Sequence, residues 1–342
     1  MSRVRAGGGG ARRPSVALAL SRALALLRAL ACAALAAWAL GARAQAADAC
    51  PPAPRLPTPE QVQTAQREAR DHGFLWRVTK DGRSSYLFGT LHVGRLAWAF
   101  PGPRLRAALR QVDELALELD LADPAVMQAM AGAARAAPPV LDPALRERLQ
   151  RQVAAACVGE TALQALHPVM QAVTLTVLAG RWEDLDAGYA QELMLGAQAR
   201  SAKLPIVSLE SAQAQLELLM PRDEAELARV VAQALEQLEQ GRVRPLLRRL
   251  AQVWERSELD ALERYTEWCA CADTDDDRAF LARLNDERNA PMAERIAGLH
   301  AQGRRLLVAV GALHMTGPQG LPRLLAARGF AVEQLTPAPA AR

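Results

Sequence analysis

The residues of this chain best suited to chemistry are two histidines that follow a glycine at the same spacing. Gly89–His92 reads GTLH, and Gly311–His314 reads GALH. Neutral imidazole is a common metal ligand, and glycine lets the backbone approach a bound group closely. A lone histidine after a buried strand is more often structural, but two in the same context favour a shared site. The repeated turn therefore predicts that His92 and His314 meet at one metal ion.

Both turns follow short apolar runs that are typical of buried strands. Tyr86–Phe88 leads into the first turn, and Leu306–Val310 leads into the second. If the two strands lie close in one sheet, where neighbours are about 4.8 Å apart, both turns open at the same edge. Imidazoles more than about 10 Å apart would exclude a shared ion, because each ligand atom lies only ~2.0–2.2 Å from the metal.

A carboxylate is the third ligand that such a site needs. The strand expected over Glu114–Asp120 reads ELALELD, so that Glu114, Glu118 and Asp120 share one face. We expect Glu118 to complete the ligand set with the two histidines. One position then stays open for water, as in catalytic zinc sites, and zinc, manganese and cobalt all suit these donors.

Three further polar residues stand at the ends of expected elements, and each has two interpretations. Glu210 ends the short strand expected over Leu204–Glu210 and is either a general base or an acid favoured by the dipole of the following helix. Arg288 and Asn289 lie shortly before Pro291 at a helix boundary. They are either structural or a clamp for an oxyanion or carboxylate, since arginine offers bidentate donors and asparagine a neutral one.

Residues 1–46 have the composition of a cleaved export signal. They contain seven arginines, no acid, an apolar run over Ala29–Leu40, and small-x-small patterns that end at Ala44 and Ala46. The alternative is a membrane anchor over Val16–Leu40. That anchor would bury two arginines at roughly 2.5–3.5 kcal/mol each, and its uninterrupted part is shorter than the ~20 residues of a span. We therefore expect export to the periplasm or beyond.

The net positive charge of the whole chain comes from this segment. The net charge is +4, but the residues after position 46 comprise 34 basic and 37 acidic residues. They include no basic stripe with interleaved aromatics, which argues against a nucleic-acid partner. They include no second membrane span either, and their number suffices for one large domain or two small ones.

Four cysteines follow the expected signal: Cys50, Cys157, Cys269 and Cys271. An even number in an exported protein permits disulfides. The spacing of Cys269 and Cys271 suggests a bridge too tight to be relaxed, so pairing with Cys157 or Cys50 is expected instead. Unpaired thiols and a thiolate metal site are the alternatives, although the second Cys-x-x-Cys half of a zinc site is missing.

Hydrophobic periodicity divides the rest of the chain into strands and long helical blocks. Helical spacing fills about 123–200 and 212–299, and Asp81-Gly82 predicts a hairpin turn. The expected strands span 74–80, 84–88, 114–120, 204–210, 306–310 and 330–335. They must pair across large helical insertions. This predicts an α/β (α+β) single domain with a mixed central sheet over 74–337, preceded by an extended segment at 47–73.

Three stretches carry a family resemblance. They are FLWRVTKDGRSSYLFGTLHVG from Phe74, LPIVSLES from Leu204, and LNDERNAPMAERIAGLHAQGRRLLVAVGALHMTGPQGLPRLLAARGFAV from Leu284. Together they resemble the TraB/GumN family, which is related to the Tiki metalloproteases, over roughly Phe74–Leu335. In that wider group the paired Gly-x-x-His motifs and an acid are the proposed metal and catalytic elements.

The resemblance implies an exported, Tiki-like metal-dependent hydrolase that acts on a peptide. Its metal would be held by His92, His314 and Glu118, with Glu210 as a base and Arg288 or Asn289 as the oxyanion donor. The competing class is a non-catalytic binding protein for a peptide or glycan, since TraB-like proteins are associated with pheromone shutdown and GumN with polysaccharide clusters. The local signatures of thermolysin-like, esterase-like and nucleotide-hydrolysing enzymes are absent from the sequence.

Overall fold

The computed structural model describes residues 50–134, 140–159, 161–221 and 223–336. The fold described below is that of the second of two units of the chain, Pro51–Arg342. The export signal expected at 1–46 lies outside the described residues. None of the helices within the described ranges combines the length and hydropathy that a membrane span requires.

The described residues of the second unit form a sheet of six strands in the order β4-β3-β5-β2-β1-β6. β2 to β5 form a parallel set, whereas β1 pairs antiparallel with both β2 and β6. This confirms the expected α/β fold with a mixed sheet. The strands are β1 (Phe74–Lys80), β2 (Arg83–Thr90), β3 (Glu114–Leu117), β4 (Ile206–Ser208), β5 (Leu306–Gly311) and β6 (Ala331–Thr336).

The hairpin between β1 and β2 sets the register of the antiparallel part. Asp81 and Gly82 have φ values of 50° and 71°. Positive φ at both central residues is the type I′ geometry, whose twist matches that of the flanking strands. Leu75 therefore pairs with Phe88, and Trp76 with Leu87.

The parallel strands place their carboxyl ends at one edge of the sheet. β5 occupies the middle of this set, between β3 and β2, and Leu306–Val310 are all 0% exposed. A strand buried on both faces needs the continuous apolar run seen in the sequence. Since β2, β3, β4 and β5 point the same way, the residues that follow them, His92, Glu118, Glu210 and His314, gather at the same edge.

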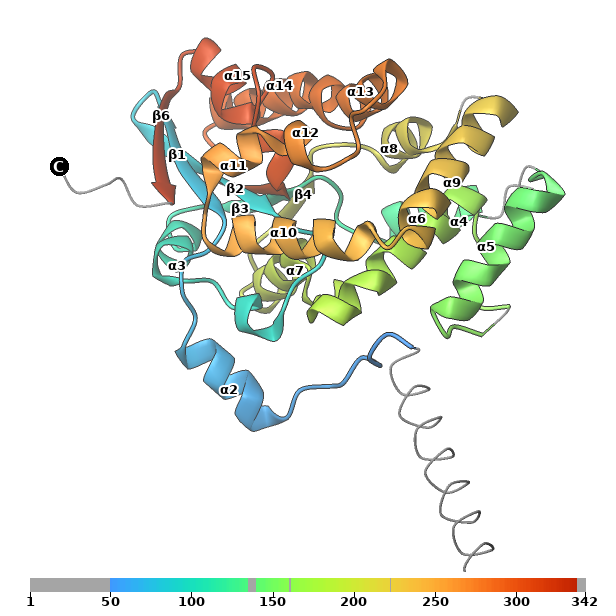
Figure 1. Ribbon diagram of the computed structural model, residues 1–342. Coiled ribbons are helices and arrows are strands. Elements are labelled where there is room, and N and C mark those ends of the chain that lie inside the picture. The colour runs from blue at the N-terminus through green and yellow to red at the C-terminus, as the bar shows by residue number, and fades with distance from the viewer. Residues whose placement is uncertain (1–49, 135–139, 160, 222, 337–342) are drawn as a thin grey trace, which may run out of the picture. The chain divides into compact units, whose positions relative to one another are not determined.

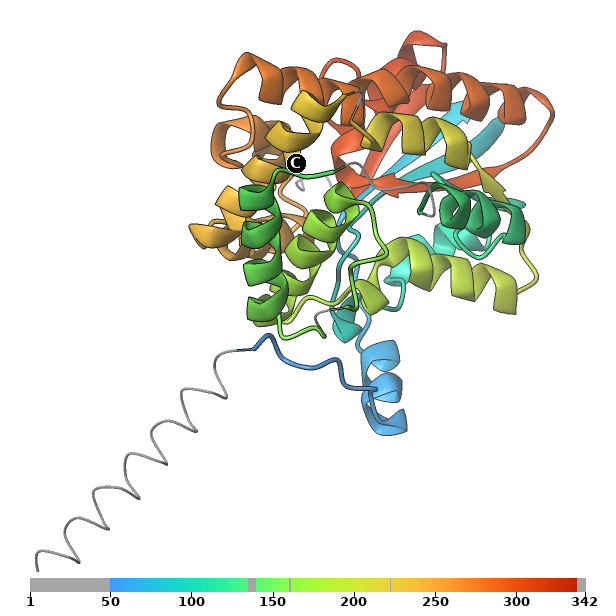
Figure 2. The same cartoon turned by 90° about the vertical axis from the view of Figure 1, so that its right-hand side faces the viewer.

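Helices cover both faces of the sheet. Figure 1 shows α14 (Glu287–Ala301) and α15 (Leu321–Ala327) on one side, and α7 (Gln191–Ser201) and α10 (Val243–Glu255) on the other. α5 (Pro143–Ala155), α6 (Pro168–Ala179) and α9 (Glu224–Glu239) enclose a second, smaller apolar core. Figure 2 shows α5 and α6 packed side by side, away from the sheet. The other α-helices in the described part of the chain are α2 (Pro59–Arg67), α3 (Pro103–Leu109), α4 (Pro124–Ala134), α8 (Ala212–Leu219), α11 (Leu259–Glu263), α12 (Tyr265–Trp268) and α13 (Asp275–Leu281).

The segment at 47–73, expected to be extended, instead contains helix α2. Thr58 caps its first turn by accepting a hydrogen bond from the Gln61 backbone, and the Gln61 side chain accepts one from the Thr58 backbone in return. Pro59 occupies the first turn, where its missing N–H costs nothing. This reciprocal capping box explains why a proline-rich sequence turns helical at this point.

The expected cysteine pairing is wrong for Cys269, which bonds with Cys271 itself. Their Cα atoms are 5.1 Å apart, within the usual range for a disulfide. The intervening Ala270 makes this approach possible because it adopts a left-handed conformation, with φ of 50°. Cys157 is disulfide-bonded as well.

Candidate metal centre

The two Gly-x-x-His turns meet at the carboxyl edge of the sheet, and their glycines serve different purposes. A Cβ on Gly89 would lie 3.1 Å from the Cα of Ala312, so this glycine lets the second turn pack against the first. A Cβ on Gly311 would lie 3.9 Å from Nε2 of His92 and 3.6 Å from Cδ2 of His314. The two imidazoles therefore converge on the same space in front of Gly311.

The turn that carries His92 is tied to the segment before α7. The backbone N–H of Leu91 donates to Oε1 of Gln191 at 2.7 Å, and Gly94 forms a two-way backbone bridge with Asp186. A Cβ on Gly94 would stand 2.3 Å from the carbonyl oxygen of Tyr189, so only glycine permits this approach. The bridge fixes the backbone of the turn, although 73% of the His92 side chain is exposed.

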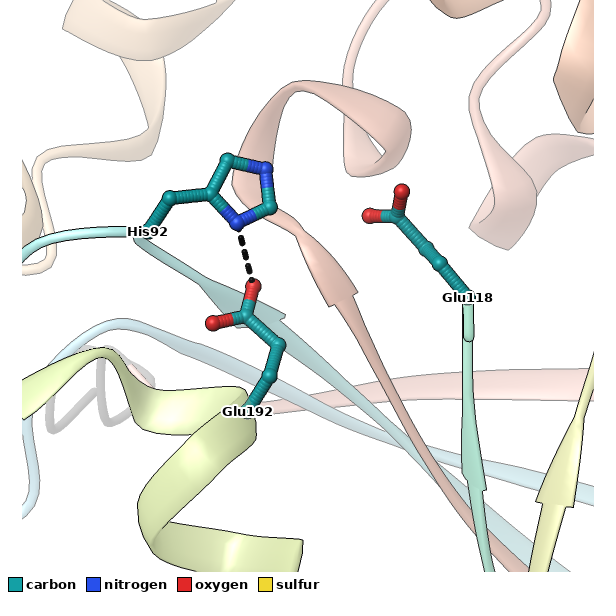
Figure 3. Close-up of side chains that lie close together, drawn as sticks. All are labelled: His92, Glu118 and Glu192. Atoms are coloured by element: carbon teal, nitrogen blue, oxygen red, sulfur yellow. Dashed lines mark ion pairs between the residues drawn. The ribbon is translucent and has the colours of Figure 1, made fainter. Parts of the chain in front are cut away.

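Glu192, on the first turn of α7, contacts the His92 ring. Its Oε1 lies 3.1 Å from Nδ1 of His92 and also accepts a hydrogen bond from the Thr90 hydroxyl. Figure 3 shows the Glu192 carboxylate below the His92 ring, at Nδ1, and the Glu118 carboxylate to the right of the ring. The Glu192 carboxylate raises the pKa of the His92 imidazole.

His314 is buried, and its ring is held in place through Nδ1. Nδ1 lies 2.7 Å from Oδ1 of Asn289, which can only accept, so Nδ1 carries the proton and Nε2 has a free lone pair. That Nε2 lies 3.6 Å from Oε1 of Glu118. Burial lowers the pKa of His314 to about 4, although Glu118 acts in the opposite direction, and the ring is therefore neutral at pH 7.

Glu118 is a buried carboxylate that stays ionised because of its neighbours. Oε1 accepts a 2.8 Å hydrogen bond from the backbone N–H of Gly311, and Oε2 accepts one from Nη2 of Arg288. Burial alone would raise the pKa of Glu118, but His314, Arg288 and His92, with the Gly311 N–H, lower it to about 2. Oε1 of Glu118 would also lie 3.4 Å from a Cβ on Gly311, so it faces the same space as both imidazoles.

Arg288 joins Glu118 to Glu210. Its Nε donates to Oε1 of Glu210 at 2.9 Å, Nη2 donates to both carboxylates, and Nη1 donates to the carbonyl of Leu284 at 3.0 Å. The side chains of Arg288, Glu118 and Glu210 are 11%, 9% and 8% exposed. Burial works against the guanidinium charge, but the hydrogen bonds to Glu210 and the charge of Glu118 outweigh it and raise the pKa of Arg288.

The model of the TraB/PrgY/gumN family matches residues 74–334. The chain belongs to this family. The match runs from the start of β1 into β6 and includes every residue of the site. Comparison with curated proteins and with solved structures gave no match.

In this TraB/PrgY/gumN family protein, one group of described side chains has the composition and spacing to hold a metal ion. His92, Glu118 and Glu192 each offer a ligand atom, and these atoms lie within 4.8 Å of one another. Among the described residues, Oε2 of Glu192 is buried without a hydrogen-bond partner. An ionised oxygen in this state is costly unless a cation or another donor reaches it, so the group fits a divalent ion.

The structure brings together every residue singled out from the sequence. Some of them face the space in front of Gly311, and the others contact those residues. His92, Glu118 and His314 face the space in front of Gly311. Glu210, Arg288 and Asn289 form hydrogen bonds around these three. Arg288 donates to Glu210 and to Glu118, and Asn289 accepts from Nδ1 of His314. Glu192 was missed because it lies in a helical stretch with no motif, and only its contact with His92 identifies it.

Proposed function

We propose that the protein is a metal-dependent hydrolase that cleaves a peptide bond in front of Gly311. The observation that carries this proposal is the convergence of two imidazoles and one ionised carboxylate on a single space at the carboxyl edge of the parallel strands. Ligands of open α/β sheets bind at this edge. Glycine at position 311 also leaves free the space beside the three donors that a side chain there would occupy.

His92, His314 and Glu118 would hold the ion. Glu192, which belongs to the group of possible ligands with His92 and Glu118, would contact Nδ1 of His92 instead, whereas His314 stands outside that group and faces Glu118 through Nε2. Zinc, manganese or cobalt suit this set of nitrogen and oxygen donors. When bound, a divalent ion lowers the pKa of water and polarises a carbonyl oxygen. Neighbouring residues keep the ligand atoms of His314 and Glu118 free of protons, as metal binding requires. Asn289 keeps Nε2 of His314 deprotonated, and Gly311 and Arg288 keep Glu118 ionised. Such outer partners orient ligands and strengthen metal binding.

The roles that we propose for Glu210, Arg288 and Asn289 differ in part from those expected from the sequence. Both carboxylate oxygens of Glu210 accept hydrogen bonds from Arg288, so Glu210 holds Arg288 against Glu118 instead of acting as a free base. Asn289 is 0% exposed and bonded to His314, which makes it a positioning residue for that imidazole. Arg288 supplies a fixed positive charge beside Glu118, where negative charge would be stabilised.

A non-catalytic binding protein for a peptide or polysaccharide is the second candidate. It is favoured by the same Arg288 network, because this network leaves neither Glu118 nor Glu210 with both oxygens free to accept a proton. The hydrolase is the better supported of the two, since Glu118 and both imidazoles still face one space.

The function is tested by metal content and turnover together. We expect purified protein to contain about one divalent ion per chain and to cleave members of a fluorogenic peptide library. The double variant His92→Ala, His314→Ala should lose both the ion and the turnover. Metal-free protein that still binds peptide, or a double variant that retains its turnover, would support the binding protein instead.

We also propose that the protein is exported, on the composition of residues 1–46. Periplasmic extraction should release a chain that begins near Gln45 or Ala47, as determined by N-terminal sequencing. Intact protein that still carries Met1 and stays with washed membranes would show an anchor instead.

A further inference from the structure

Glu192 is an acid outside every motif of the sequence, yet it is fixed against the His92 ring. Only 15% of its side chain is exposed, and its Oε1 accepts a hydrogen bond from Thr90 in β2 and lies 3.1 Å from Nδ1 of His92. Gln191, its neighbour, binds the backbone of Leu91. The start of α7 therefore holds the His92 turn by its backbone and the imidazole by its side chain.

We propose that Glu192 is the positioning residue of His92: by accepting the Nδ1 proton, it turns Nε2 toward the space in front of Gly311. This inference rests on the proposed function, since it assigns His92 to the metal ion through Nε2. His92 is 73% exposed, so packing alone leaves its ring free to rotate. The largely buried Glu192 carboxylate removes that freedom, and it would keep the proton on Nδ1 when a metal ion displaces the proton on Nε2.

The orientation of the His92 ring indicates that Glu192 positions this ring and does not itself bind the metal ion. The two nitrogens of an imidazole point in different directions, and it is Nε2 that lies 3.9 Å from the Cβ position at Gly311, close to Glu118. Nδ1 faces Glu192 instead. The same arrangement recurs at His314, where Asn289 binds Nδ1 while Nε2 faces Glu118. Each histidine of the pair thus has its own acceptor, a carboxylate for one and an amide for the other.

Zinc titration by calorimetry tests this role with two substitutions at one position. Glu192→Gln keeps an oxygen that can accept the Nδ1 proton but is a poor metal ligand. We expect it to stay within about 10-fold of wild-type affinity, whereas Glu192→Ala should lose about 10–100-fold. The matched controls are Glu294→Gln and Glu294→Ala, on the exposed face of α14, which should bind zinc like the wild type.

Nitrogen-15 NMR of the histidines in the zinc-loaded protein gives a readout that does not depend on activity. Wild type and Glu192→Gln should show His92 with zinc on Nε2 and a protected proton on Nδ1. Glu192→Ala should lose that protected proton and show both coordination modes. A merely structural role for Glu192 would leave the coordination mode unchanged.

The outcomes separate this inference from the proposed function. A wild type that binds none of zinc, manganese and cobalt overturns the proposed function and this inference with it. Zinc binding that is equal in wild type and Glu192→Ala overturns the positioning role alone. If Glu192→Gln is as weak as Glu192→Ala, Glu192 is itself a ligand, and the positioning role is likewise wrong.

Discussion

Substituting Gly311 with alanine is expected to lower metal affinity at least about 100-fold without unfolding the protein. The new methyl group would fill the space that Glu118, His314 and His92 face, at 3.4 to 3.9 Å from their atoms. These are ordinary van der Waals contacts, and the backbone of Gly311, with φ of −48° and ψ of 138°, suits alanine. The loss should equal or exceed that caused by removing an outer partner of a ligand, which is about 10–100-fold.

The measurement is zinc binding by calorimetry, together with the midpoint of thermal unfolding of the metal-free protein. Gly298→Ala is the matched control, because Gly298 lies exposed inside α14 with open space around its Cβ position. That substitution should leave metal binding unchanged and stabilise the fold by about 0.5–1 kcal/mol, as alanine does in an exposed helix. Normal zinc affinity in Gly311→Ala would show that the ion binds elsewhere.

Substituting Arg288 with alanine should destabilise the protein by about 3–5 kcal/mol. The change leaves two buried carboxylates, Glu118 and Glu210, without the cation that both of them contact, and an unpaired buried charge is costly. Lysine should restore little of this, because it cannot match the bonds that the guanidinium makes to both acids and to Leu284.

Chemical denaturation of metal-free protein measures this effect. The control is Arg151→Ala, which removes an exposed ion pair with Glu147 within α5 and should change the free energy of unfolding by no more than about 0.5 kcal/mol. Adding Glu118→Gln and Glu210→Gln to Arg288→Ala should recover part of the loss, since the buried charges are then gone. An Arg288→Ala variant within about 1 kcal/mol of the wild type would show that water or another cation compensates for the guanidinium.

Much of the fold was predictable because local sequence determines it. Asp81-Gly82 specifies a hairpin through its tolerance of positive φ, and the apolar run of Leu306–Val310 specifies a strand buried on both faces. Parallel strands then bring the residues after their carboxyl ends to one edge. The spacing of His92 and His314 in two equal turns therefore predicted their convergence without any knowledge of the structure between them.

Periodicity and glycines at defined positions were enough to predict where the strands, the turns and the residues that face the proposed metal lie. The hydrogen-bond partners of these residues could not be predicted in this way, because they depend on tertiary packing. Arg288 forms hydrogen bonds to Glu118 and Glu210, and the first of these joins residues 170 positions apart in the sequence. The contact of Glu192 with His92 joins a helix to a turn that is distant in the sequence. No local pattern encodes such contacts, because they depend on how helices inserted between the strands pack back onto the sheet. The bond between Cys269 and Cys271 was likewise decided by the backbone conformation of a single residue, Ala270, which spacing alone does not reveal.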